Sequence, residues 1–271
     1  MNTSVPPQLP PAQPRLHLLY HELRPVPAKY SYVVAVPDFD QHMQLVARIR
    51  ASASSILWPE VTFDDGHLSN FEHALPILES HHLIARFFIT VGWPGQKPGY
   101  MDWPQIRSLH QAGQAIGAHG WTHTLLTHCA ARDLELELVT ARHTLEDKLG
   151  APVTTMSLPG GRSNPRVLAA CQAAGYTQVF TSVPKPEPFP LGPLVGRLNV
   201  RGDMDLPWIA GLFERGSTTL AGLERRDGRK AIVKALLGDR LYASIWSLLN
   251  REESETVPGD ASANENTPPH Q

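Results

Sequence analysis

The stretch VTFDDGHLSNFEHALPIL, residues 61–78, contains the pattern that decides the fold. An apolar segment is followed by a turn at Gly66, and then by a helical pattern that we expect to run from Asn70 to Ser80. Two aspartates, Asp64 and Asp65, lie in the turn. Successive side chains of a regular strand point to opposite faces, so both carboxylates can serve one site only because the chain turns there.

The same order of strand and helix recurs along the chain. Apolar segments that we predict to be buried strands lie at residues 15–23, 61–63, 85–91, 115–119, 153–159, 176–182 and 194–200. Alternation of this kind predicts an α/β fold with a parallel sheet. No Gly-rich phosphate turn follows an early strand, so we expect the sheet to close into a barrel rather than to form a doubly wound sheet.

Composition limits the classes of function. A chain of 271 residues with 42% hydrophobic content can bury one large core. Its net charge of −2 gives no electrostatic footprint for nucleic acid. The Pro-rich start has no apolar signal-peptide core, no run approaches a membrane span, and the two cysteines lack a metal-type spacing. We therefore expect a cytoplasmic protein.

The region after residue 205 has a different pattern. An every-fourth-residue apolar ridge predicts an amphipathic helix over residues 229–250. We expect it to pack on the barrel, and a membrane-surface or partner helix is the alternative. The predicted organisation is a disordered Pro-rich tail at 1–14, the barrel at 15–205, a C-terminal helical extension at 206–250 and a disordered tail at 251–271.

A second chemical feature is AHGWTH, residues 118–123, at the end of another predicted strand. With a turn at Gly120, His119 and His123 have a spacing that allows both imidazoles to approach one metal ion. Two histidines and one carboxylate make a three-ligand site suited to zinc, cobalt, nickel or iron(II). Asp65 would be the carboxylate ligand, and Asp64 would act as general base on metal-bound water. The alternative is that the Asp-Asp-Gly sequence is only a turn.

Taken together, Thr-Phe-Asp-Asp-Gly at 62–66 and His-x-x-x-His at 119–123 closely resemble the polysaccharide deacetylases of the NodB-homology type, also called carbohydrate esterase family four. The resemblance covers roughly residues 15–205. It implies a distorted (β/α) barrel of about seven strands and metal-dependent removal of an N-acetyl or O-acetyl group from a carbohydrate. By resemblance, Asp64 is the base and Asp65, His119 and His123 bind the metal, with zinc favoured over cobalt or nickel.

The late motifs of that family are changed here. Ser157 stands where the third motif usually has the Arg that supports the catalytic aspartate, and we consider Arg162 as a substitute. Arg197 stands where the final motif usually has the His that protonates the leaving amine. His21, at the end of the first strand, is our candidate for the missing acid or for an oxyanion donor. A buried structural histidine is an equally weighted alternative.

Several residues are candidates for contact with a sugar. Aromatic side chains in a Pro/Gly-rich loop are suited to stacking on a pyranose, and backbone N–H groups beside glycine can approach an oxyanion. The predicted substrate-binding residues are Trp93, Tyr100, Trp103, Trp121, Pro159, Gly160 and Arg162.

The predicted function is therefore that of a metal-dependent hydrolase that removes an acetyl group, most often N-acetyl, from a glycan or glycan precursor. One alternative is a catalytically weakened glycan-binding protein of the same fold, and another is a hydrolase of a small non-sugar amide. A non-haem iron oxygenase has the same ligand set, but the spare aspartate argues against it.

Overall fold

The computed structural model describes residues 13–28, 31–52, 55–216, 218–223 and 225. The chain divides into two compact units, residues 1–228 and 229–271, and all described residues belong to the first. Residues 1–12 of the predicted N-terminal tail, the predicted helix at 229–250 and the predicted tail at 251–271 lie outside the described residues.

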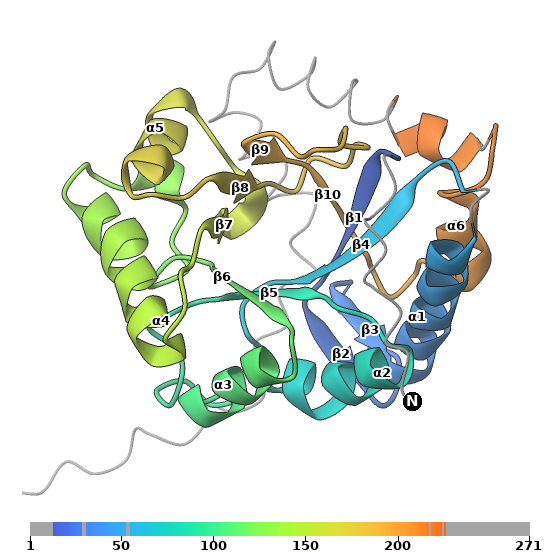
Figure 1. The fold of residues 1–271 in the computed structure, drawn as a ribbon, viewed down its shortest axis with the longest axis horizontal. Coiled ribbons are helices and arrows are strands. Elements are labelled where there is room, and N and C mark those ends of the chain that lie inside the picture. The colour runs from blue at the N-terminus through green and yellow to red at the C-terminus, as the bar shows by residue number, and fades with distance from the viewer. Residues whose placement is uncertain (1–12, 29–30, 53–54, 217, 224, 226–271) are drawn as a thin grey trace, which may run out of the picture. The chain divides into compact units, whose positions relative to one another are not determined.

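A parallel sheet of eight strands forms the centre of the first unit (Figure 1). The strand order is β10-β1-β4-β5-β6-β7-β8-β9. The strands are β1 Arg15–Tyr20, β4 Trp58–Phe63, β5 Arg86–Ile89, β6 Ala115–Ala118, β7 Thr155–Ser157, β8 Gln178–Phe180, β9 Leu194–Val195 and β10 Arg197–Asn199. A separate parallel pair, β2 Glu22–Arg24 and β3 Val33–Ala35, follows β1 in the chain.

The sheet curls so far that side chains of distant strands meet. Arg197 on β10 hydrogen-bonds to Ser157 on β7 at 2.7 Å, although four strands separate β10 from β7 in the sheet order. It also reaches the carbonyl oxygen of Thr181, just after β8, at 3.1 Å. Such contacts require the sheet to close nearly upon itself, so the predicted distorted (β/α) barrel is confirmed.

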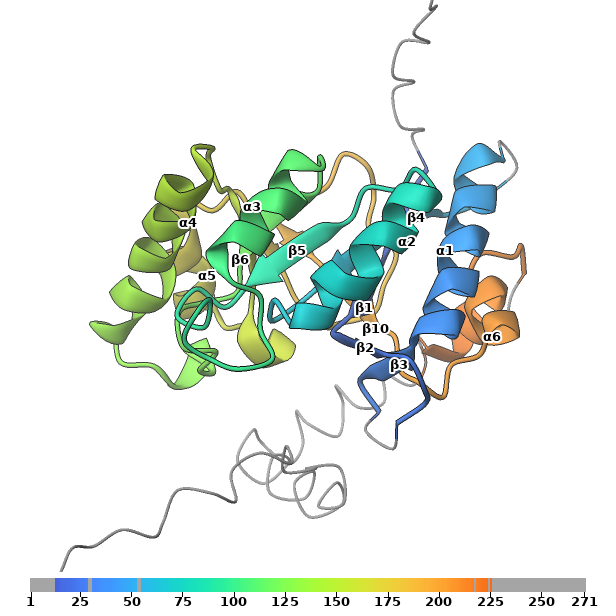
Figure 2. The ribbon, with the colours of Figure 1, turned by 90° about the horizontal axis from the view of Figure 1, so that it is seen from below.

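Helices surround the outside of the barrel (Figures 1 and 2). The α-helices are α1 Val36–Ala51, α2 Leu75–Ser80, α3 Trp103–Gln111, α4 Ala141–Leu149, α5 Pro165–Ala173 and α6 Leu206–Gly211. Two π-helical segments, Asn70–Ala74 and Glu135–Thr140, lead into α2 and α4, and two 3₁₀ turns lie at Leu126–His128 and Pro159–Gly161. None of the helices in the described part of the chain is long and apolar enough to cross a membrane.

Alternation along the strands separates two packing environments. On β5, Phe87 and Ile89 belong to the large hydrophobic core shared with the helices. Phe88, which points to the other face, packs with Phe180 and Val195 in a second and smaller cluster inside the barrel. Among the described residues, the apolar cluster inside the barrel is therefore small. Polar side chains at alternate strand positions occupy the rest of the barrel interior.

Side-chain caps mark the starts of two of the helices. Asp102 forms a capping box at the start of α3, and Asn164 caps α5 ahead of Pro165. Asn70, the first residue of the predicted helix at 70–80, does not cap a helix. It lies inside the π-helical segment, and its side-chain amide donates a hydrogen bond to the carbonyl oxygen of His21 at 2.7 Å.

Two features differ from the expected strand and domain boundaries. The segment 194–200 is not one strand, because the chain breaks at Gly196 between β9 and β10. Residues after 205 still contribute to the core, since Ile209 of α6 and the following Leu212 are fully buried in the same hydrophobic cluster as the barrel.

Candidate metal and catalytic site

The side chains of the two aspartates after β4 point in different directions because the chain turns there. Asp65 has a φ of 73° and Gly66 a φ of 82°, so two successive residues adopt the left-handed conformation. Such a conformation in a non-glycine residue is uncommon and often marks a functional position. The turn directs the Asp64 carboxylate into the barrel, toward Arg197, and the Asp65 carboxylate toward the two histidines.

His119 and His123 meet the Asp65 carboxylate from a second turn, just after β6. The Nε2 atoms of His119 and His123 lie 3.3 Å and 3.2 Å from Asp65 Oδ1. His123 has a φ of 67°, and Gly120 has a φ of 75°. The chain therefore turns sharply between the histidines, as the sequence predicted, and brings both imidazoles to one carboxylate.

The geometry of this cluster fits a divalent metal ion. The ligand atoms of Asp65, His119 and His123 all lie within 4.8 Å of one another. The Oδ1 atom of Asp65 is buried and has no hydrogen-bond partner, which marks a place for a cation. His119 Nδ1 donates to the carbonyl oxygen of Ser157 at 2.8 Å, and this tautomer leaves Nε2 free to act as a ligand.

The charge state of the carboxylate also suits a ligand. Burial alone would raise the pKa of Asp65, but the adjacent imidazoles of His119 and His123 outweigh it and hold this pKa well below its usual value. Asp65 is therefore an anion at neutral pH. An anionic carboxylate with two imidazoles is a donor set that suits zinc, cobalt, nickel or iron(II).

Glu137 holds the turn between the two histidines and was not identified from the sequence. Its buried carboxylate accepts hydrogen bonds from the backbone N–H of Trp121 at 2.7 Å and from the N–H of Thr122 at 3.1 Å. It also accepts a bond from the Thr122 hydroxyl at 2.5 Å. Because these contacts fix the backbone between the imidazoles, Glu137 orients the ligands without touching them.

Asp64 forms a buried ion pair with Arg197. The two terminal nitrogens of Arg197 each lie 2.7 Å from one carboxylate oxygen, and the Ser157 hydroxyl donates to Oδ2 at 2.9 Å. Burial would raise the pKa of Asp64, but the Arg197 guanidinium, with His119 nearby, lowers it below its usual value. The suggestion that Arg162 supports Asp64 was wrong, because Arg162 is exposed and makes no ion pair with the described residues.

His21 follows β1 near this site. Its Nδ1 atom is buried and has no hydrogen-bond partner, and its ring lies 5.3 Å from the ring of Tyr32. Burial lowers the pKa of His21, while the charges of Asp64 and Asp65 act in the opposite direction. An unpaired imidazole under the influence of both aspartates has the placement that a role in the chemistry requires, but its role stays a prediction.

Two of the predicted aromatic residues lie together beside the metal ligands. The rings of Trp93 and Tyr100 are 4.4 Å apart between centroids, and the Trp93 ring is 5.4 Å from the ring of His123. The Lys97 ammonium lies 3.5 Å from the Trp93 ring centroid. This group of Trp93, Lys97 and Tyr100 forms an aromatic and cationic wall, and Lys97 was not identified from the sequence.

The other predicted substrate residues are placed differently. Trp103 starts α3 and packs on the core with the Lys148 ammonium 5.7 Å from its ring centroid, so it does not join the wall. Trp121 packs against the backbone of Gly92. Pro159 is buried and Gly160 has a φ of 65° in the turn that follows β7. The N–H of Gly161 in that turn already donates to the Leu158 carbonyl at 2.7 Å.

The fold and the cluster define a (β/α) barrel protein with a potential metal centre at the carboxyl ends of β4 and β6, the face that carries the chemistry in α/β barrels. Residues 60–179, which include both motifs, match the family model described as polysaccharide deacetylase. The predicted resemblance to the polysaccharide deacetylases is therefore confirmed.

Individual relatives agree with the family match. YxkH of Bacillus subtilis (strain 168), which its name groups with the polysaccharide deacetylases, is 27% identical over 124 residues, or 46% of this chain and 44% of that protein. The chitooligosaccharide deacetylase of Sinorhizobium fredii is 27% identical over 146 residues, or 52% of this chain and 63% of that enzyme. The match thus spans less than two thirds of either relative.

The fold is shared with solved deacetylase structures. The deacetylase PplD of Streptococcus pyogenes, solved with acetate, has a TM-score of 0.64 and 18% identity, covering 72% of this chain and 96% of that one. At this identity the likeness shows a common fold, and the chemistry has to be argued from the site itself.

Proposed function

We propose that this chain is a metal-dependent hydrolase that removes an acetyl group, in the first instance N-acetyl, from a carbohydrate or glycan precursor. The observation that carries the proposal is the convergence of Asp65, His119 and His123 beside the buried carboxylate of Asp64. A plain turn at Asp-Asp-Gly would not require three ligand atoms to point at one place. The names of the matched relatives, a chitooligosaccharide deacetylase among them, support the acetylated sugar as substrate class.

In this proposal zinc is the favoured ion, and its contribution is to polarise the acetyl carbonyl and to lower the pKa of a nearby water molecule. Asp64 accepts the proton of the attacking water. A carboxylate offers about four acceptor positions. Arg197 and the Ser157 hydroxyl fill three of those on Asp64, so one remains for the water.

Hydrolysis of an amide also requires a proton on the leaving nitrogen. As the water oxygen bonds to the acetyl carbon, the carbon–nitrogen bond breaks and the amine takes up a proton. We assign the delivery of this proton to His21, which passes to the amine the proton that Asp64 takes from the water; its Nδ1 atom is buried without a partner, and the charges of both aspartates act on the ring. Arg197 does not replace the family's late histidine as acid, since its guanidinium is committed to Asp64 and does not release a proton at neutral pH.

The wall formed by Trp93, Lys97 and Tyr100 supplies the sugar-binding surface in this proposal. Stacking of a pyranose on an aromatic ring buries apolar C–H surface while the ring hydroxyls stay hydrated. The closeness of the Trp93 ring to His123, 5.4 Å between centroids, would put a stacked sugar beside the metal ligands. Lys97 adds a hydrogen-bond donor to hydroxyl or carbonyl oxygens of the same ligand.

The test combines metal content with turnover. The full chain, loaded with zinc, is incubated with N-acetylated chitooligosaccharides, and released acetate is measured. We expect about one ion per chain, with the ion and activity lost in a His119→Ala, His123→Ala variant. We expect Asp64→Asn to keep the ion and to lose acetate release. Sugar binding without any release by the loaded wild-type chain would refute the enzyme and favour the glycan-binding alternative, and release from acetylated non-sugar amides alone would refute the sugar.

A further inference from the structure

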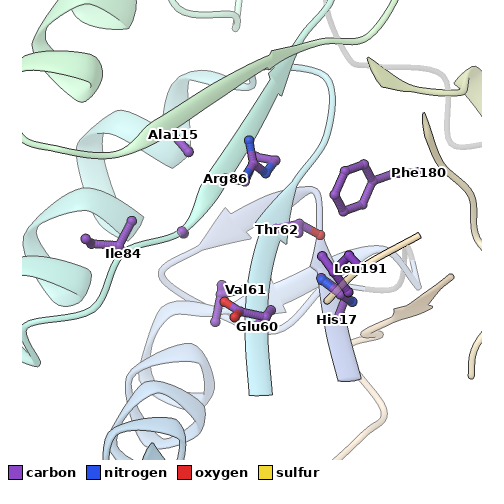
Figure 3. Close-up of a pocket in the computed structure, with 10 residues that line it drawn as sticks. His17, Glu60, Val61, Thr62, Ile84, Arg86, Ala115, Phe180 and Leu191 are labelled. Carbon is purple, nitrogen blue, oxygen red and sulfur yellow. The ribbon is translucent and has the colours of Figure 1, made fainter. Parts of the chain in front are cut away.

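A cavity separate from the candidate metal site lies toward the amino-terminal ends of β1, β4, β5 and β6 (Figure 3). Its volume is about 130 Å³. The residues that line it are His17, Glu60, Val61, Thr62, Ile84, Ala85, Arg86, Ala115, Phe180 and Leu191. It shares no residue with the cluster of Asp65, His119 and His123, which follows the carboxyl ends of β4 and β6.

His17 contributes an unsatisfied polar group to this cavity. The residue is 3% exposed, and its Nδ1 atom is buried without a hydrogen-bond partner among the described residues. Its ring makes only an edge contact with Phe180, at 5.7 Å between centroids. Buried polar groups nearly always have a partner, so the unpaired Nδ1 atom indicates a ligand or ordered water.

Arg86 contributes a guanidinium with free donors. Among the described residues it makes one hydrogen bond, from Nη1 to the Thr155 hydroxyl at 3.2 Å, and it lies 5.8 Å from the Phe180 ring centroid. A guanidinium carries five N–H donors. Figure 3 shows Arg86 and His17 around the same opening, together with Phe180 and Thr62.

The charges around the cavity have a positive excess. Glu60 is the carboxylate in the lining, and it is already paired with Arg50 at 2.9 Å and with Arg15 at 3.6 Å. The pKa of His17 is lowered to about 3, first by burial and then by the positive charges of Arg197, Arg86, Arg15 and Arg50. At neutral pH His17 is therefore a neutral N–H donor in a positive potential, which favours an anion.

We propose that this cavity binds a small carboxylate, with Arg86 and His17 donating hydrogen bonds to its oxygens and Phe180 and Leu191 contacting its alkyl end. A cavity of 150 Å³ accommodates benzene, so one of about 130 Å³ admits a ligand of roughly four to six non-hydrogen atoms. That range corresponds to acetate through butyrate. A carboxylate with a short alkyl chain matches the lining better than phosphate does, because the lining combines the cationic Arg86 with apolar side chains such as Phe180 and Leu191.

Calorimetric titration of the full chain with sodium acetate, propionate and butyrate, at constant ionic strength, tests this binding. The neutral isostere acetamide is the ligand control. The metal cluster is silenced by the His119→Ala, His123→Ala variant, in which carboxylate binding should persist. Arg86→Met removes the cationic donor, and Arg48→Met, at an exposed arginine of α1, is the charge-matched control.

We expect carboxylate binding by wild type and by Arg48→Met, at least tenfold weaker binding by Arg86→Met, and none of acetamide. Equal binding by Arg86→Met, or loss of all binding with the metal ligands, would overturn the proposal. A crystal structure of wild-type protein soaked in propionate decides the matter even if Arg86→Met does not fold. Density for the carboxylate within hydrogen-bonding distance of Arg86 and His17 is the expected result, and water molecules alone in the cavity would refute it.

Discussion

Replacement of Arg197 by methionine tests whether the ion pair with Asp64 organises the centre of the barrel. The change removes two hydrogen bonds of 2.7 Å to the carboxylate, whose side chain is 4% exposed. Hydrogen bonds to charged groups contribute about 1.5–3 kcal/mol each, so two of them amount to about 3–6 kcal/mol. Removal of one partner from a buried ion pair typically lowers the free energy of unfolding by about 3–5 kcal/mol. We therefore expect the free energy of unfolding to fall by about 3–5 kcal/mol.

A double-mutant cycle measures the interaction energy between Asp64 and Arg197 separately from the other effects of each substitution. Asp64→Asn leaves the guanidinium of Arg197 buried without its counter-charge and should also be destabilising. The double variant contains neither charge, so its loss should be smaller than the sum of the two single losses by about 2–3 kcal/mol. The assay is urea unfolding of chelator-treated protein at neutral pH, followed by circular dichroism. Additive losses, or a loss below about 1 kcal/mol for Arg197→Met, would refute a tightly coupled pair.

The same variant should reverse one pH dependence. In the wild type the pKa of Asp64 is below its ordinary value of 3.8, so the stabilisation is complete above that value and is lost as the pH falls through the lowered pKa. Without Arg197, burial dominates and raises the pKa of Asp64. The stability of Arg197→Met should therefore decline relative to that of the wild type as the pH rises from 4 to 7. A constant difference would contradict the assignment.

Three further predictions concern other parts of the barrel. Glu137→Gln weakens the hydrogen-bond acceptor that holds the turn between the histidines. Zinc affinity, measured by chelator competition, should therefore fall about 10-fold to 100-fold. Unchanged affinity would argue against this role of Glu137. Burial lowers the pKa of His17 from its ordinary value of 6.5 to about 3, so its contribution to the free energy of unfolding is complete above pH 6.5 and falls by about 2 kcal/mol by pH 5. Urea unfolding at pH 7.5 and 5 should show a smaller pH dependence in His17→Asn, and equal slopes would contradict this. Gly117→Ala places a methyl group 2.6 Å from the Thr155 hydroxyl and should lower the free energy of unfolding in urea by about 1–3 kcal/mol. Gly192→Ala, with open space around the new methyl group, is the control and should change it little. Equal stability of the two variants would be inconsistent with this packing.

The cluster of Asp65, His119 and His123 was predictable because the placement of its residues depends on short segments. Asp64 and Asp65 directly follow a strand and precede Gly66, and parallel strands bring their carboxyl ends to one edge. The positions of His119 and His123 follow from the same rule, applied to β6. Local pattern and strand direction thus fix which end of the barrel carries these side chains.

The supporting residues were not predictable because they depend on closure of the sheet. Glu137 comes from the π-helical segment before α4, yet its carboxylate lies under the turn between the histidines. No spacing in the sequence relates a glutamate on an outer helix to that turn. The cavity at the amino-terminal ends of the strands was not predictable for the same reason. In the sequence His17 is a single polar residue in an apolar strand, and only the curled sheet brings Arg86 to the same cavity.

Positions 157 and 197 show why two departures from a motif have to be considered together. The catalytic aspartate of the resembled family is supported by an arginine of the third motif, where this chain has Ser157. The structure supplies the guanidinium from β10 instead, and Ser157 both donates to Asp64 and accepts from Arg197. A second arginine at position 157 would add a buried positive charge that a single carboxylate does not neutralise, which is costly because Asp64, Ser157 and Arg197 are all buried. A small hydroxyl residue at 157 is therefore the partner that an arginine at 197 requires. The two departures from the resembled motifs are therefore coupled: the support of Asp64 comes from a different strand, and in the proposed reaction the proton donor is a residue other than the one at 197.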